Sequence, residues 1–287
     1  MKESMYIARL TLLVACLGSV VSGCKQSREA TELAPGSGSK ALPTKAAEPP
    51  AQARAPAPQP PSPPEGMVYV PGGSFDMGPP RAVTLGKAPE HMQVAPFFLD
   101  RTEVTVAAYL TCARGGGCAA PIHQAGCNAT AKKPLLQHPM NCITKKQAEQ
   151  YCAAQGKRLP SAAEWEFAAR GTDGRVYPWG NDTPGEQLCW QGRAGAHSKT
   201  TCPVGSFPQG ASPFGALDMA GNVAEWTSTA ETETASAGAF RTRGGSYALE
   251  PIDLSSPETL MVRADQWETF SADDASPRLG VRCAKSL

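Results

Sequence analysis

The chain has 287 residues, with 27 Lys and Arg against 26 Asp and Glu. Because the two signs nearly cancel, the composition predicts no nucleic-acid partner. Ten cysteines are many for this length and indicate an oxidising compartment. The two ends differ sharply in composition, so we expect one folded domain behind an extended N-terminal region.

The N-terminus has the pattern of an export signal. Lys2 and Arg9 precede an apolar run over 10–21 that is too short to span a bilayer as a stable helix. The run ends in Val-Ser-Gly-Cys24, which resembles a bacterial lipoprotein box. We therefore predict a signal peptide over 1–23 and a lipidated Cys24 that anchors an exported protein in the bacterial membrane at the periplasm, outer membrane or cell surface. The alternative is an ordinary secretory signal in which Cys24 is incidental.

The segment 24–65 is rich in Pro and Ala and has almost no large apolar side chains. Such a segment cannot bury enough surface to offset its ordering entropy, so we predict an extended tether. A partner-binding Pro-rich ligand is the alternative, but no repeated motif supports it. The remaining residues, 66–287, form the predicted domain.

Short strands are expected near the start of this domain. Alternating apolar residues around Pro-Gly-Gly predict a hairpin over 66–78, and a further strand is expected over 94–99.

Three helices follow in the sequence. Thr105 is a candidate cap for a helix to about Ala113, and two capping boxes, Thr144-x-x-Gln147 and Ser161-x-x-Glu164, open the other two. The later residues are dense in Gly, Pro and aromatics, so the sequence predicts an α+β domain with low regular secondary structure.

Eight cysteines remain beyond Cys24, and an even number in an exported domain is expected to form disulfides. A metal site is the alternative, but no Cys-x-x-Cys or His pair occurs and the four histidines are scattered. Spacing does not fix the connectivity. Near neighbours are candidate pairs, which leaves the last two for each other: Cys112 with Cys118, Cys127 with Cys142, Cys189 with Cys202, and Cys152 with Cys283.

Several motifs appear in a fixed order. They are GMVYVPGGSFDMG at 66–78, EVT at 103–105, GKRLPSAAEWEFAARG at 156–171, YPWG at 177–180, DMAGNVAEW at 218–226, RGGSY at 243–247 and LGVRC at 279–283. Together they resemble the formylglycine-generating-enzyme family, also called sulfatase-modifying factors. The resemblance implies a single domain with a variant C-type-lectin-like fold, and it implies the Cys152–Cys283 bridge. We expect this domain to be monomeric.

The resemblance also implies one structural calcium ion, at positions equivalent to Asp218, Gly221, Val223 and Glu225. Oxygen ligands of this kind suit calcium, although composition alone favours a plain surface turn. A second calcium site of some relatives is expected to be lost, because Leu188 and Cys189 replace its start.

The family's copper-binding cysteines follow its Gly-Gly-Ser motif. Alignment on RGGSY places Leu249 and Leu254 there, and no cysteine occurs between Cys202 and Cys283. Soft thiolates are the ligands that monovalent copper requires. We therefore expect neither copper nor formylglycine chemistry, and no iron, since the His-x-x-x-Glu-x-His helix of iron-using relatives is absent. Ala224 replaces a Trp that is usual in the family.

The candidate cleft contains Ser246, Glu250, Asp253 and Arg263. No histidine can be named as a base for Ser246, whose expected role is a hydrogen bond in the Gly-Gly turn. The other three residues either line the cleft or are solvated loop charges. Two functions follow: an envelope protein that binds a peptide or glycan without catalysis, or a cysteine-independent oxidase or tautomerase that uses Glu250 or Asp253 as a base, as relatives resembling pyoverdine-maturation proteins do.

Overall fold

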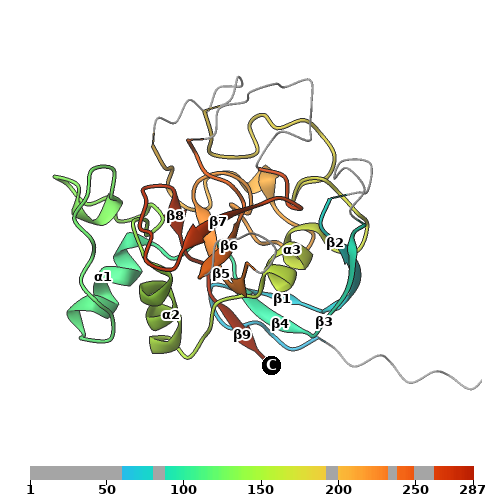
Figure 1. The fold of residues 1–287 in the computed structure, drawn as a ribbon, viewed down its shortest axis with the longest axis horizontal. Coiled ribbons are helices and arrows are strands. Elements are labelled where there is room, and N and C mark those ends of the chain that lie inside the picture. The colour runs from blue at the N-terminus through green and yellow to red at the C-terminus, as the bar shows by residue number, and fades with distance from the viewer. Residues whose placement is uncertain (1–59, 80–87, 192–199, 232–237, 249–261) are drawn as a thin grey trace, which may run out of the picture. The chain divides into compact units, whose positions relative to one another are not determined.

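A computed structural model describes residues 60–79, 88–191, 200–231, 238–248 and 262–287 (Figure 1). The chain divides into two units, Met1–Pro56 and Ala57–Leu287. The predicted signal peptide, Cys24 and most of the tether lie outside the described residues and stay predictions. No helix of the described residues is long and apolar enough to cross a membrane.

The first sheet joins the beginning and the end of the domain. Its order is β1 (Met67–Val70), β4 (Phe97–Asp100) and β9 (Ala284–Ser286), and both pairs are antiparallel. The last strand therefore adds to the sheet that the first strand starts.

The predicted hairpin over 66–78 is wrong. β2 (Gly73–Met77) pairs with β3 (Glu90–Val94) in a separate sheet, not with β1. The Pro-Gly-Gly turn leads the chain from one sheet to the next. Gly72 has φ 70°, and a Cβ there would lie 2.4 Å from the Val94 carbonyl oxygen, so the turn needs glycine.

The predicted strand over 94–99 is two strands instead. β3 ends at Val94 and β4 begins at Phe97. Pro96 lies between them, and proline cannot donate to a ladder.

The third sheet has the order β7-β6-β5-β8. Its strands are β5 (Ala224–Ala230), β6 (Ala239–Arg243), β7 (Trp267–Ser271) and β8 (Leu279–Gly280). β5 is antiparallel to β6 and parallel to β8. The DMAGNVAEW motif leads into β5, and the RGGSY motif begins at the last residue of β6. This sheet therefore positions the candidate site.

The three expected helices are confirmed. They are α1 (Val106–Arg114), α2 (Lys145–Ala154) and α3 (Ala162–Arg170), and two short 3-10 turns, η1 (Asn128–Thr130) and η2 (Pro208–Gly210), accompany them. Thr105 accepts from the Ala108 N–H, and both capping boxes are complete. Local capping chemistry therefore sets where these helices begin.

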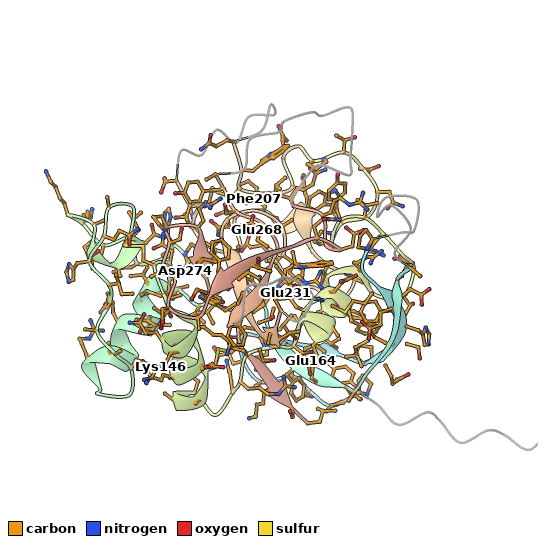
Figure 2. The ribbon with its side chains drawn as sticks, viewed as in Figure 1. Lys146, Glu164, Phe207, Glu231, Glu268 and Asp274 are labelled. Atoms are coloured by element: carbon orange, nitrogen blue, oxygen red, sulfur yellow. A yellow bond between two sulfur atoms is a disulfide. The ribbon has the colours of Figure 1, made fainter. Side chains whose placement is uncertain are left out.

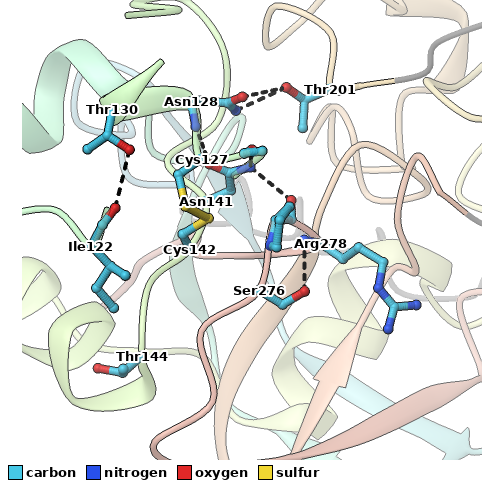
Figure 3. Close-up of a disulfide and its surroundings, with 12 residues drawn as sticks. Ile122, Cys127, Asn128, Thr130, Asn141, Cys142, Thr144, Thr201, Ser276 and Arg278 are labelled. Carbon is cyan, nitrogen blue, oxygen red and sulfur yellow. Dashed lines mark hydrogen bonds between the residues drawn. A yellow bond between two sulfur atoms is a disulfide. The ribbon is translucent and has the colours of Figure 1, made fainter. Parts of the chain in front are cut away.

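Four disulfides join Cys112 to Cys118, Cys127 to Cys142, Cys152 to Cys283, and Cys189 to Cys202. These are the four pairs put forward from the sequence. Figure 3 shows the second pair, beside which the Asn128 N–H donates to Asn141 Oδ1 at 2.7 Å and Asn141 Nδ2 donates to the Pro277 carbonyl at 2.8 Å. The bridge and these amides tie the segment after α1 to the C-terminal part of the domain.

Candidate functional site

The RGGSY turn follows directly after β6. Gly244 and Gly245 have φ 91° and 65°, a region that disfavours other residues. A Cβ on Gly244 would lie 3.2 Å from Cζ2 of Trp165, so the turn packs closely against α3. The two glycines therefore allow the left-handed backbone of this turn, and a side chain at Gly244 would crowd the Trp165 indole.

This turn is bonded to the turn at Gly221 and Asn222. The Gly221 N–H donates to the Gly244 carbonyl, and the Tyr247 N–H donates to the Asn222 carbonyl, both at 2.9 Å. Asn222 has φ 54°, a left-handed conformation that asparagine tolerates. Two motifs far apart in the sequence are thus held together through their backbones.

Ser246 is buried at this junction, and its Oγ has no hydrogen-bond partner among the described residues. The Asn222 Nδ2 is also buried without a partner. The expected hydrogen bond of Ser246 within the Gly-Gly turn is therefore absent. Buried polar groups without partners are rare and mark positions where water or a ligand group is needed.

Among the described residues, no histidine is hydrogen-bonded to Ser246 Oγ. His138 Nδ1 contacts Thr201 Oγ1 at 2.9 Å, and His91 Nδ1 contacts Asp76 at 3.0 Å on the β2–β3 hairpin. Burial lowers the pKa of His138. Nucleophilic activation of Ser246 thus has no support here.

Arg263 is neither a solvated charge nor a free cleft group. It is buried and donates through Nε and an Nη to both Asp265 oxygens, at 2.9 and 2.6 Å. Its interpretation as an exposed loop charge is corrected by this bidentate ion pair. Glu250 and Asp253, like Leu249 and Leu254, lie outside the described residues.

Glu225 faces α3 and the C-terminal motif. Side chains alternate along a strand, so Ala224 and Trp226 face the opposite side, where they join a buried cluster. The Glu225 carboxylate accepts from Trp165 Nε1 at 2.6 Å and from Nε and an Nη of Arg282 at 2.8–3.1 Å.

Arg282 uses every donor that it has. Beyond Glu225, it donates to the carbonyls of Asp100, Arg101 and Leu217 at 2.7–3.0 Å. Burial alone lowers the pKa of Arg282, but the nearby carboxylates of Glu225, Glu103 and Asp218 outweigh burial and raise it.

Glu103 and Asp218 add two further buried acids beside this pair. Burial and the neighbouring Asp218 raise the pKa of Glu103 well above its ordinary value, and in the described part of the chain neither Glu103 oxygen has a hydrogen-bond partner. Burial also raises the pKa of Asp218, although the Gly205 N–H donates to its Oδ2 at 2.5 Å. Three carboxylates thus surround one guanidinium, which leaves excess negative charge when all three are ionised.

The predicted calcium ligands fit this arrangement in part. Asp218 and Glu103 would favour a cation when both are ionised, and Asp218 has φ 57°, which turns the loop at its start. Glu225, however, already has two donors at each oxygen. In the described part of the chain, no three His, Cys, Asp or Glu side chains are grouped as a metal site. A calcium ion would depend on Asp218 and on backbone carbonyls.

All eight cysteines of the domain are oxidised in disulfides. The described residues therefore hold no thiol that could bind a soft metal. This feature separates the site from one that works through a thiolate pair.

Two cavities are lined by described residues. One, of about 620 Å³, lies between β3, the end of α2 and the start of α3; the other, of about 250 Å³, lies beside Arg170 and the end of β2. Neither is lined by Ser246 or Tyr247. The cleft predicted beside Ser246 therefore stays a prediction.

The small sheets, three short helices, long loops and bridge from Cys152 to the C-terminal strand define a C-type-lectin-like α+β domain. The solved structures agree: PvdO from Pseudomonas aeruginosa superposes with a TM-score of 0.61 at 25% identity, covering 77% of this chain and 94% of that one. Treponema denticola variable protein 1 has a TM-score of 0.59 at 17% identity over 77% of this chain and 95% of its own, which shows the fold alone.

The family model described as the sulfatase-modifying factor enzyme 1-like domain matches residues 52–287. The chain therefore belongs to the formylglycine-generating-enzyme family. The formylglycine-generating enzyme of Streptomyces coelicolor is 31% identical over 84% of this chain and 94% of its own length.

An inactive relative is also similar. The bovine protein named inactive C-alpha-formylglycine-generating enzyme 2 is 38% identical over 52% of this chain. The chain spans about half the length of this relative and of its mouse counterpart.

The sequence reasoning missed the roles of Glu103 and Arg282. Glu103 lies in the EVT motif and Arg282 lies in the LGVRC motif, but the sequence pattern alone gives neither residue a role. Each motif places a charged residue beside an apolar one, Glu103 before Val104 and Arg282 after Val281. Because charged side chains are rarely buried unless they are paired, this pattern indicates a buried ion pair.

Proposed function

We propose that this protein is an envelope lipoprotein whose domain binds a peptide or glycan and does not form formylglycine. The observation that carries the proposal is the absence of a free thiol in the domain: Leu249 and Leu254 stand at the aligned copper positions, and the eight cysteines are all paired.

The replacement of both aligned cysteines by leucine removes the ligands that copper needs. Monovalent copper is held by thiolates, and leucine offers no lone pair. A disulfide cannot replace a thiolate as ligand. The similarity to a bovine relative named as inactive supports the same conclusion.

The unpartnered polar groups support a binding role at the RGGSY turn. Ser246 Oγ and Asn222 Nδ2 lie on two turns joined by backbone hydrogen bonds, and Tyr247 beside them is half-buried. A ligand with amide or hydroxyl groups would satisfy both donors, while the half-exposed ring packs against it. Peptides and glycans carry these groups.

Binding to arrays of envelope glycans and peptides tests this proposal. Wild type should retain a defined ligand class, and Tyr247→Ala should reduce binding at least tenfold. The matched control is Tyr69→Ala, because Tyr69 is a half-buried tyrosine on β1 whose ring is tilted against Phe98. Equal loss in both variants, or no ligand on either array, would count against a site at this turn.

The second candidate is a cysteine-independent oxidase or tautomerase with Glu250 or Asp253 as base. The likeness to PvdO supports this second candidate function, because PvdO shares the fold at 25% identity. Oxygen consumption or isomerisation that is lost in Glu250→Gln, with Glu268→Gln as control, would favour this function over simple binding.

We also propose one structural calcium ion in the loop 218–226 and anchoring through a lipidated Cys24. Asp218 and the carbonyls of Gly221 and Val223 would hold the ion, and Glu225 would join only through an oxygen that already accepts from Arg282. Metabolic labelling with a fatty acid tests the anchor: Cys24→Ser should abolish incorporation, while Cys16→Ser should leave it.

A further inference from the structure

The near-neutral total charge conceals a strong local asymmetry. Between Glu103 and Glu149 the chain has no Asp or Glu, and it carries five basic residues: Arg114, Lys132, Lys133, Lys145 and Lys146. We call residues 104–148 the basic lobe. It comprises α1, η1, the start of α2 and the segments that join these three elements, the green region at the left of Figure 1.

Most of this positive charge is uncompensated. Lys145 pairs with Glu149 on the next helical turn. The other four basic residues have no carboxylate partner among the described residues. Lys132 and Lys133 are exposed, and Lys146, labelled in Figure 2, lies on α2 at the lower left. The lobe therefore presents a positive surface.

The same lobe exposes an apolar side chain. Leu136 is 49% exposed, and the only other large hydrophobic residue exposed in the described parts of the chain is the C-terminal Leu287. Leu136 follows the two lysines in the sequence Lys-Lys-Pro-Leu-Leu over 132–136. A leucine beside unpaired lysines is the combination that interfacial membrane segments use.

The exposure of Leu136 is imposed by the backbone. Its carbonyl accepts from the Ala107 N–H at 3.0 Å, and the flanking residues Leu135 and Gln137 are bonded to Asn128 and Val204, at 3.1 and 2.9 Å. The Cys127–Cys142 bridge closes this segment at its base. Because the loop is fixed from both sides, Leu136 cannot turn inward without breaking these bonds.

We propose that the loop 131–138 of the basic lobe docks on an anionic phospholipid surface, with Lys132 and Lys133 at the phosphates and Leu136 inserted between headgroups. Soluble polyanions and nucleic acids would satisfy the lysines but give no role to a fixed, exposed leucine. A bilayer satisfies both, because its interface is apolar below a negatively charged plane. This inference does not depend on the ligand proposed for the RGGSY turn.

Vesicle binding and lysine footprinting test the proposal together. The full chain with Cys24→Ser in every arm, which removes the acyl anchor, is mixed with vesicles of phosphatidylcholine alone or with added phosphatidylglycerol. Phosphatidylglycerol should strengthen binding, and Lys132→Gln with Lys133→Gln should weaken that binding on the order of 30-fold, from about 1 kcal/mol per lysine. Leu136→Ser should weaken it about fivefold. The control Arg101→Gln with Lys285→Gln removes two exposed charges elsewhere and should change it less than twofold.

Footprinting gives a local measurement that the apolar N-terminus does not affect. Anionic vesicles should protect Lys132 and Lys133 from a lysine-acylating reagent and leave Lys285 reactive. Equal protection of Lys285, or loss of binding in the control equal to that in the loop variant, would overturn the proposal. Protection by soluble polyglutamate as strong as by vesicles, with no effect of Leu136→Ser, would also overturn it and assign the lobe to a soluble polyanion.

Discussion

Arg282 binds both carboxylate oxygens of Glu225 in the buried centre of the domain, with N–O distances of 2.8–3.1 Å. The pair joins the C-terminal motif to the DMAGNVAEW motif. Arg282 also lies near the buried acids Glu103 and Asp218, so its loss removes a positive charge that stabilises three carboxylates.

Arg282→Met should therefore destabilise the domain by about 3–5 kcal/mol, the usual cost of removing one partner of a buried pair. Urea unfolding measures this change. Arg175→Met is the control, because Arg175 pairs with the half-exposed Asp173 and such pairs contribute less than about 1 kcal/mol. Adding Glu225→Gln to Arg282→Met should recover part of the loss; an additive double variant would contradict direct coupling.

The disulfides should differ in their contribution to stability. In the chain-entropy model, removing Cys152–Cys283, which closes 131 residues, costs about 5 kcal/mol. Removing Cys112–Cys118, which closes 6 residues, costs about 2 kcal/mol. Paired Cys→Ser variants compared by thermal unfolding measure the difference. Equal losses would show that the long bridge does not act through loop closure.

Glu103 should make stability depend on pH. Its folded pKa is raised above the ordinary value of 4.5 by burial and by Asp218, so the folded state holds a proton that the unfolded state releases. The stabilisation is full below pH 4.5 and is lost as pH rises through the folded pKa. Glu103→Gln keeps the neutral form, and should stabilise the domain above that pKa by about 1 kcal/mol or more. Unchanged pH dependence in this variant would contradict a protonated Glu103.

Calcium should raise the melting temperature if the loop 218–226 binds it. Ligands that bind only the folded state stabilise it by mass action, so Tm should rise with calcium concentration and fall with a chelator. Asp218→Asn should abolish the shift, whereas Asp274→Asn, an exposed acid that accepts from the Ser271 N–H, should not. A wild-type Tm that does not change with calcium concentration would contradict a calcium site in this loop. Arg282 would then be the cation that compensates the acids of this cluster.

Local chemistry predicted local structure well. Both capping boxes and the Thr105 cap gave correct helix starts because they depend on hydrogen bonds within three residues. Three disulfide pairs join near neighbours, 6, 15 and 13 residues apart, and the fourth, Cys152–Cys283, is the pair that remains and that the family resemblance implies.

The sequence did not predict which strands pair with each other. The Pro-Gly-Gly turn was interpreted as a hairpin, yet β1 pairs with β4 and β2 with β3, since alternation does not specify the partner strand. Arg263 was predicted near a cleft or in solvent, but it is buried and paired with Asp265. The acids around Arg282 come from two distant segments, EVT and DMAGNVAEW, and only the folded chain brings them to the C-terminal motif.

The most direct test of the central claim measures Cu(I) binding by competition with a chromogenic chelator and conversion of a cysteine-containing peptide by mass spectrometry. Wild type should neither bind stoichiometric Cu(I) nor convert the peptide, and Leu249→Cys with Leu254→Cys should gain Cu(I) binding. Formylglycine formed by the wild-type protein, with copper retained, would contradict the account.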